Sequence, residues 1–327
     1  MAKKKKANNN DSTQSPTDQI QGSTVLQVSR SDILKSLIEA YGKEGTKEKK
    51  QKFSELLSKK IHEIINASKI AEKYDVLIIF DETTMLKTDS DRIYNGLSAL
   101  GKDKKDLLLI LVSNGGEPGS AYLIGKLCQA HVSGKKFIVA VPRQAKSAAT
   151  LLACAADEIH MGSMSELGPI DLQIDGSPAL GLKQSIEHIA EIVEKYPDAA
   201  EMFSRYLIRS VKPVQIGYYE RAAESVRQYA EILLGGRQTA TTKEKPKDET
   251  AKTLVHKYKD HGFVIDKSEA TNIFGADTIK QETGEYLLAN EIYIELSEIK
   301  RIANILKYTF FFIGTADSEP SLLEYRR

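Results

Sequence analysis

The chain has 327 residues, of which 41% are hydrophobic, and its 46 lysines and arginines nearly balance its 45 aspartates and glutamates. This length and apolar content suffice for one large globular domain, and a net charge of +1 gives no electrostatic argument for a nucleic-acid or membrane-surface partner. Cys128 and Cys154 have neither metal-ligand spacing nor a disulfide framework around them. We therefore expect both to be reduced packing residues in a cytoplasmic protein.

The first 24 residues have the composition of a disordered, solvated tail. Lysines at positions 3–6 are followed mainly by Asn, Ser, Thr and Gln, with no apolar segment. A secretory signal would need such a segment, so we do not interpret residues 1–24 as one. Nowhere does the sequence contain an apolar run of roughly 18 residues, the length that spans a bilayer, so we expect no membrane span.

Residues 25–73 form a predicted helical extension. Helix patterns cover residues 29–40 and 47–73, and the second has apolar side chains at spacings of three and four. These side chains are Phe53, Leu56, Leu57, Ile61, Ile64 and Ile65. Because the rest of this helix is highly charged, the apolar stripe must lie against either the sheet of the main domain or another subunit.

From residue 74 to residue 316, short apolar runs alternate with helix patterns. Runs at 76–80, 106–112 and 137–141 predict buried strands, and the helices expected after them cover 91–100, 120–131 and 147–156. This alternation predicts one α/β domain around a mostly parallel sheet with right-handed crossovers. A charged tail is expected at 317–327.

Downstream patterns extend the same domain. We expect strands at 158–161 and 309–314, and helices at 182–195, 198–210, 213–234, 249–261 and 293–306.

Ser147 stands at the beginning of the helix predicted at 147–156, after a buried strand and a turn. Serine is among the commonest N-cap residues, and an N-cap role alone would explain its position. The order strand, turn, serine, helix also places a hydroxyl beside the free amide donors and positive end of a helix. A developing oxyanion would be stabilised there.

Two adjacent glycines, Gly115 and Gly116, follow the strand at 106–112. Glycines at such a position let the backbone approach a bound group closely and present N–H donors to it. Ligands of open α/β sheets sit at the carboxyl ends of the strands. We therefore expect the glycine loop and Ser147 to open on one crevice.

Three segments together give the sequence a specific resemblance. They are SNGGEPGS at 113–120, AKSAATLLACAADEIHMG at 145–162 and SELGPIDLQID at 165–175. In this order they resemble the Clp protease/crotonase superfamily and, within it, the serine dehydrogenase proteinase family, relatives of signal peptide peptidase A. The resemblance covers residues 75–175 well and 213–280 more loosely. It implies an α/β fold of repeated ββα units with a mostly parallel sheet flanked by helices.

The resemblance also implies roles for individual residues. Ser147 matches the nucleophile of the family, and the N–H groups of Gly116 and Ala148 match the oxyanion-hole donors. The sequence departs from the Clp proteases because no histidine and aspartate are recognisable at their set spacings. The Ser-His-Asp version of the site is therefore in doubt, which leaves a Ser-Lys version or a protein without catalysis.

A serine hydroxyl needs a base that accepts its proton, because it is a weak nucleophile at neutral pH. His160 is one candidate, although its strand can point it into the sheet or away from the site. Lys212 is the preferred one, since its apolar neighbours and the proline that opens the next helix would favour the neutral amine that a base requires. Relatives of signal peptide peptidase A use a lysine downstream of the serine as the base, and Lys212 lies in about the matching region. Lys195 and Lys183 are alternative candidates for this base.

We therefore expect a serine peptidase that hydrolyses peptides or unfolded protein segments, with catalytic Ser147 and Lys212. Two alternatives remain open. One is a crotonase-like acyl-CoA enzyme, whose fold stabilises an enolate with a similar pair of amides. The other is a catalytically inactive assembly module with a regulatory role.

Expectations about partners and cofactors follow from the resemblance and from the motifs. The relatives assemble into rings or stacked oligomers, so we expect a homo-oligomer. The sequence shows no metal-ligand cluster, phosphate-binding glycine loop, dinucleotide fingerprint or nucleic-acid motif. We therefore expect no cofactor, no metal and no nucleic-acid partner.

Overall fold

The fold is described from a computed structural model, which places residues 27–101, 105–171, 173–174, 177–178, 181–210, 212–238 and 246–325. The tail expected at 1–24 lies outside the described residues. No helix in the described part of the chain is both long and apolar enough to cross a bilayer. Cys128 and Cys154 are buried and free of disulfides, as expected of packing residues.

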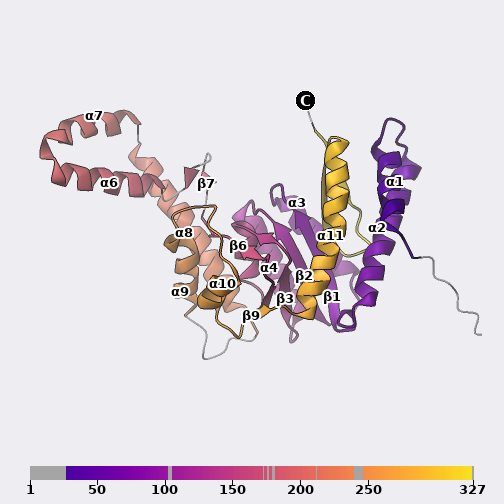
Figure 1. Ribbon diagram of the computed structural model, residues 1–327. Coiled ribbons are helices and arrows are strands. Elements are labelled where there is room, and N and C mark those ends of the chain that lie inside the picture. Colours follow the sequence, from indigo (N-terminus) through magenta and orange to yellow (C-terminus); the bar gives the residue numbers. More distant parts are fainter. Residues whose placement is uncertain are drawn as a thin grey trace, which may run out of the picture.

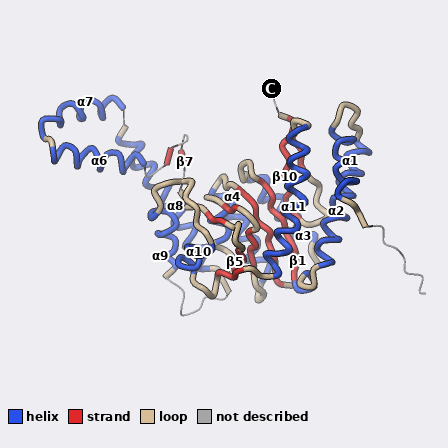
Figure 2. The backbone as a smooth tube through the Cα atoms, viewed as in Figure 1, coloured by secondary structure: helices blue, strands red, loops and turns tan. Residues whose placement is uncertain are grey.

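The core of the structure is a mostly parallel mixed sheet, as the sequence predicts (Figure 2). Its order is β11-β10-β1-β2-β3-β5-β9, in which the β1–β10 and β10–β11 pairings are antiparallel and the other pairings are parallel. These strands are β1 Tyr74–Asp81, β2 Asp106–Ser113, β3 Phe137–Val141, β5 Glu158–Met161, β9 Ile279–Gln281, β10 Tyr308–Gly314 and β11 Ser321–Glu324. Continuous apolar runs form β1 to β3 because both faces of these strands are buried.

Helices cover both faces of the sheet (Figure 1). On one face pack α3 Lys87–Ala99, α4 Pro118–Val132, α5 Ala148–Ala153, α8 Pro213–Gly235, α9 Lys247–Lys252 and α10 Lys267–Phe274. On the other face pack α1 Arg30–Tyr41, α2 Lys47–Ala67 and α11 Gly284–Ile305. Alternate strand residues enter the two cores, so Leu77 and Ile79 face the first layer while Ile78 and Phe80 face the second.

The N-terminal helices belong to this second layer. Phe53, Leu57 and Ile61 of α2 are fully buried, in the same apolar cluster as Phe80 of β1 and Phe312 of β10. The apolar stripe predicted at 47–73 therefore packs against the sheet of its own chain, and not against another subunit.

The C-terminal segment differs from its expectation. Residues 317–327 were expected to be only a charged tail, but they include β11, which pairs with β10. Leu322 lies opposite Phe310 in this pairing. The expectation was wrong here because two apolar residues between charged ones are too short a pattern to distinguish an edge strand from a tail.

A helical arm interrupts the compact part of the chain. The short hairpin of β7 Gln173–Ile174 and β8 Ser177–Pro178 leads into α6 Gly181–Lys195, η2 Pro197–Ala199 and α7 Ala200–Ser210. Figure 1 shows α6 and α7 projecting from the body before α8 returns to it.

Candidate active site

Ser147 sits on a strained turn between the sheet and α5. After β3, the two-residue strand β4 Gln144–Ala145 pairs with the end of β2, and the Lys146 N–H donates to the Ser113 carbonyl at 2.9 Å. Ser147 follows with φ 50° and ψ −116°, and its side chain makes no capping hydrogen bond to α5. A simple N-cap role therefore does not explain this serine. Such a backbone conformation in a non-glycine residue costs about 1–3 kcal/mol and is typical of functional sites.

Replacing Ser147 by glycine is expected to stabilise the fold relative to Ser147→Ala by about 1 kcal/mol, because glycine adopts positive φ without steric cost. Alanine keeps the Cβ atom and therefore the strain, so the pair of variants isolates the backbone contribution from the loss of the hydroxyl. Urea unfolding of both variants measures the difference. Equal free energies of unfolding would show that the turn is not strained.

The double-glycine loop lies directly against this turn. Gly115 and Gly116 have φ values of 96° and 152°. A Cβ atom on Gly115 would lie 2.9 Å from the Ser147 Cβ, and one on Gly116 would lie 2.4 Å from the Met85 nitrogen and oxygen. The Met85 N–H donates to the Gly115 carbonyl at 2.8 Å, and the Glu117 N–H donates to the Met85 carbonyl at 2.9 Å. Side chains at 115 and 116 are thus excluded by close backbone approach.

Two main-chain donors beside Ser147 are unused. The hydrogen bonds on either side of Gly116 engage Gly115 and Glu117, and Ala148 is the first residue of α5. Among the described residues, neither the Gly116 N–H nor the Ala148 N–H has an acceptor. Both residues border the same cavity as Ser147, so both donors are available to a bound oxygen.

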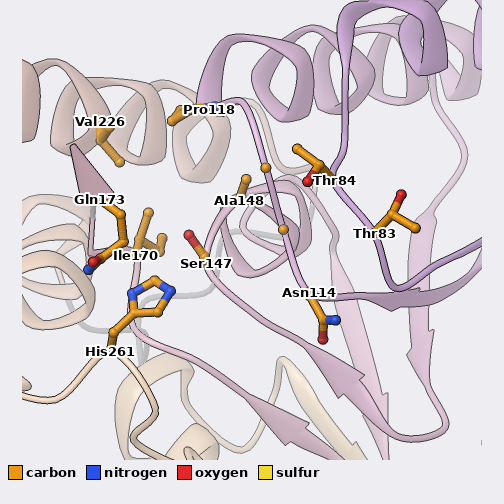
Figure 3. A pocket seen from close by; sticks show the side chains of 12 residues that line it. Thr83, Thr84, Asn114, Pro118, Ser147, Ala148, Ile170, Gln173, Val226 and His261 are labelled. Carbon is orange, nitrogen blue, oxygen red and sulfur yellow. The ribbon is translucent and has the colours of Figure 1, made fainter. Parts of the chain in front are cut away.

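This cavity has a volume of about 210 Å³ and lies at the carboxyl ends of β1 and β2 (Figure 3). Apolar and uncharged polar side chains make up most of its wall, and His261 is the one titratable side chain besides Ser147 that borders it within the described chain. The lining residues are Thr83, Thr84, Asn114, Gly115, Gly116, Pro118, Ser147, Ala148, Ile170, Gln173, Val226 and His261. The crevice expected between the two loops is therefore present.

His261 reaches the cavity from a loop that a long-range contact holds in place. The loop follows η3 Thr253–Lys257 and precedes α10. Ile265 exchanges two main-chain hydrogen bonds with Leu167, at 2.9 and 3.0 Å. This pairing fixes the loop beside residues 167–171, and so places His261 next to the segment that carries Asp171.

Asp171 faces the His261 ring. Its Oδ2 atom lies 3.7 Å from His261 Nδ1 and accepts a hydrogen bond of 2.8 Å from Gln173 Nε2. Burial raises the pKa of the Asp171 carboxyl, and His261 and Gln173 partly offset this effect. The distance of 3.7 Å is too long for a hydrogen bond, and catalytic hydrogen bonds are often long until a substrate binds. The arrangement places a hydroxyl and an imidazole at one cavity, with a buried carboxyl beside the imidazole.

The structure brings together three of the four residues proposed from the sequence. Ser147, Gly116 and Ala148 border the cavity, whereas Lys212 does not. Lys212 is exposed and immediately precedes α8, whose Val226 does line the cavity. Along the helix, the rise from Lys212 to Val226 is about 20 Å at about 1.5 Å per residue. In this structure Lys212 therefore lies away from the hydroxyl.

The rival bases also lie elsewhere. Lys183 and Lys195 are exposed on the arm, where Lys183 pairs with Glu220 at 3.1 Å. His160 is buried on β5 between Glu158 and Glu285, at 3.2 and 3.4 Å. Burial alone would lower the pKa of His160, but these two carboxylates outweigh it and raise that pKa. His160 is therefore an ion-pair residue of the core, and none of the three lines the cavity.

Sequence reasoning missed both His261 and Asp171. The helix predicted at 249–261 would have placed His261 in its last turn, but α9 ends at Lys252 and η3 ends at Lys257. The usable signals were Gly262, which breaks a helix directly after the histidine, and the Gly168-Pro169 turn just before Asp171. No spacing rule connects residues so far apart in the sequence.

Comparison with known proteins identifies the class of the chain. Residues 33–266 match the family model of the ClpP-like SDH-type serine proteinases. The chain belongs to this family, which confirms the resemblance drawn from the three sequence segments.

One curated relative and two solved structures are similar to the chain. The uncharacterized protein MJ0137 of Methanocaldococcus jannaschii is 31% identical over 156 residues, which span 46% of this chain and 53% of that protein. The match thus covers about half the length of this relative. Two mutant structures of the 1510-N membrane-bound stomatin-specific protease are 15% identical, one carrying a serine-to-alanine change and one a lysine-to-alanine change with a bound substrate peptide. Their TM-scores are 0.40 and 0.39, and the alignments cover 66% and 65% of this chain and 83% and 77% of those chains.

Proposed function

We propose that the protein is a serine peptidase that acts on extended or unfolded polypeptide. The observation that carries this proposal is the strained Ser147 turn, which borders one cavity together with two unused main-chain donors and His261. Membership in a serine proteinase family supports the same reaction class. A cavity of about 210 Å³ accommodates a side chain rather than a folded surface, so the substrate must present an extended segment.

In the proposed reaction, the Ser147 Oγ atom attacks the carbonyl carbon of the scissile peptide while His261 takes the hydroxyl proton. The N–H groups of Gly116 and Ala148 donate hydrogen bonds to the oxyanion that forms. His261 then returns the proton to the leaving amine, and the acyl-enzyme remains. Water then attacks the acyl carbonyl carbon while His261 takes one of its protons. When the bond to Ser147 Oγ breaks, His261 returns that proton to the serine oxygen, and the product leaves with a new carboxyl group.

His261 replaces Lys212 as the proposed base because of where the two residues lie. Only His261 borders the cavity of Ser147. Asp171 is buried behind the imidazole, and its carboxylate would hold the ring in one tautomer and stabilise the imidazolium that forms. Gln173 holds the Asp171 oxygen that faces the ring.

A fluorophosphonate probe, which phosphonylates activated serines, tests the proposed nucleophile. The wild-type protein should form an adduct that mass spectrometry maps to Ser147, and Ser147→Ala should not be labelled. Ser98→Ala, which alters an exposed serine of α3, should be labelled like the wild type. A folded wild-type protein that resists the probe would overturn the proposal and favour an assembly module, and turnover of an acyl-CoA thioester without peptide hydrolysis would favour the crotonase-like alternative.

A further inference from the structure

The cavity of Ser147 has a second wall, opposite His261. Figure 3 shows Thr83 and Asn114 on the far side of Ser147 from the His261 ring. Thr83 belongs to the loop at 82–86, which joins β1 to α3, and Asn114 directly precedes the glycine pair. Three segments must therefore be held in register at this end of the sheet: this loop, the glycine loop and the turn that carries Ser147.

The loop at 82–86 is fixed to the glycine loop by several hydrogen bonds. Met85 pairs with Gly116 as an isolated parallel β-bridge. Asn114 adds a side-chain bond, because its Nδ2 atom donates to the Glu82 carbonyl at 2.6 Å. These contacts join the two loops, so a shift of the first loop displaces the second and the main-chain donor it carries.

The Glu82 side chain extends this connection to the strand that leads to the serine. Its Oε1 atom accepts a hydrogen bond of 3.1 Å from Gln144 Nε2. Gln144 lies on β4, three residues before Ser147. Glu82 itself does not border the cavity. One residue thus contacts the glycine loop through its carbonyl and β4 through its carboxylate.

A cation from the opposite helical layer neutralises this carboxylate. Lys300 of α11 forms an ion pair with Glu82 Oε2, and both side chains are partly buried. Removing a carboxylate from water is costly unless it is paired and hydrogen-bonded. Gln144 and Lys300 each engage one of its two oxygens. The carboxylate is therefore fixed in one orientation.

We propose that Glu82 is a positioning residue that sets the spacing between the Ser147 hydroxyl and the Gly116 N–H. This inference rests on the serine peptidase function proposed above. Glu82 acts through Gln144 on one side and Asn114 on the other. Reacting groups must be held within about 0.5 Å of their productive geometry, and a misplacement of about 1 Å can lower a rate on the order of 100-fold.

Steady-state kinetics with a fluorogenic peptide test the role of the carboxylate. Glu82→Ala should lower kcat about 10–100-fold with little change in KM, because substrate still binds while the reacting groups are misaligned. Glu82→Gln should keep most of the wild-type kcat, since its amide can still hydrogen-bond to Gln144. Both variants lose the ion pair with Lys300. The difference between them therefore separates positioning from a merely structural ion pair.

Gln144 gives a second route to the same contact. Gln144→Leu has a side chain of similar size without the amide donor, and it should lower kcat by about the same factor as Glu82→Ala. The double variant should be no slower than the slower single variant, because residues that act through one contact are not additive. Glu298→Ala is the matched control. It removes an ion pair with Arg301 on α11 and should leave kcat and KM unchanged.

Circular dichroism and thermal unfolding establish that each variant is folded, and Gln144→Leu decides the question if Glu82→Ala is not. A wild-type kcat in folded Glu82→Ala would overturn this inference, and so would a Glu82→Gln variant as slow as Glu82→Ala. The fluorophosphonate experiment keeps the two proposals apart. With Ser147 labelled in the wild type, these outcomes contradict the role of Glu82 alone, whereas an unlabelled wild type overturns the proposed function and this inference with it.

Discussion

Replacing His261 by glutamine is expected to lower kcat for peptide hydrolysis by about 10⁴-fold, with little change in KM. Glutamine retains a polar side chain of similar reach but cannot take the proton from the Ser147 hydroxyl. The ring borders the same cavity as the hydroxyl and faces the buried Asp171 carboxylate. Steady-state kinetics with a fluorogenic peptide measure the effect, and thermal unfolding checks that the variant is folded.

Two companion variants decide whether His261 acts as the base. Lys212→Met should retain near-wild-type kcat, because Lys212 lies at the distant end of α8. The double variant of His261→Gln with Ser147→Ala should be no slower than Ser147→Ala alone, since residues that act as one unit are not additive. A wild-type rate for His261→Gln together with a loss of about 10³-fold or more in Lys212→Met would restore the lysine as the base.

The features of the candidate site whose positions the sequence predicts are local. Ser147 follows a buried strand within a few residues, and the glycine pair follows another. Each feature is readable in a short window, because a strand-turn-helix order and adjacent glycines have direct conformational meaning. Parallel strands then bring both loops to one edge of the sheet without further information.

The parts that could not be predicted depend on long-range contacts. His261 and Asp171 meet because Ile265 pairs with Leu167, and nothing in either segment specifies the other. The π-helical turn at Thr253–Lys257 ends the preceding helix earlier than its pattern indicates. The projecting arm was equally hidden, since an amphipathic pattern predicts a helix and not which surface covers it.

The fold tolerates no side chain at Gly116, and Gly116→Ala is expected to lower the free energy of unfolding by about 3 kcal/mol or more. The new Cβ atom would lie 2.4 Å from two Met85 backbone atoms, and a residue at φ 152° would be strained in addition. Molecules that still fold must shift the loop, and with it the N–H proposed for the oxyanion. We therefore expect the folded fraction to lose about 10²–10³-fold in kcat.

Gly119→Ala is the matched control, because a Cβ atom there meets nothing within 4 Å. It lies in the first turn of α4, where alanine is at least as favourable as glycine, so stability should be unchanged or raised by up to about 1 kcal/mol. Urea unfolding gives the stabilities, and titration with the fluorophosphonate probe gives the fraction of competent sites for the kinetics. A Gly116→Ala protein with wild-type stability would show that Met85 does not confine the loop. Full turnover per competent site would show that the Gly116 N–H does not stabilise the transition state.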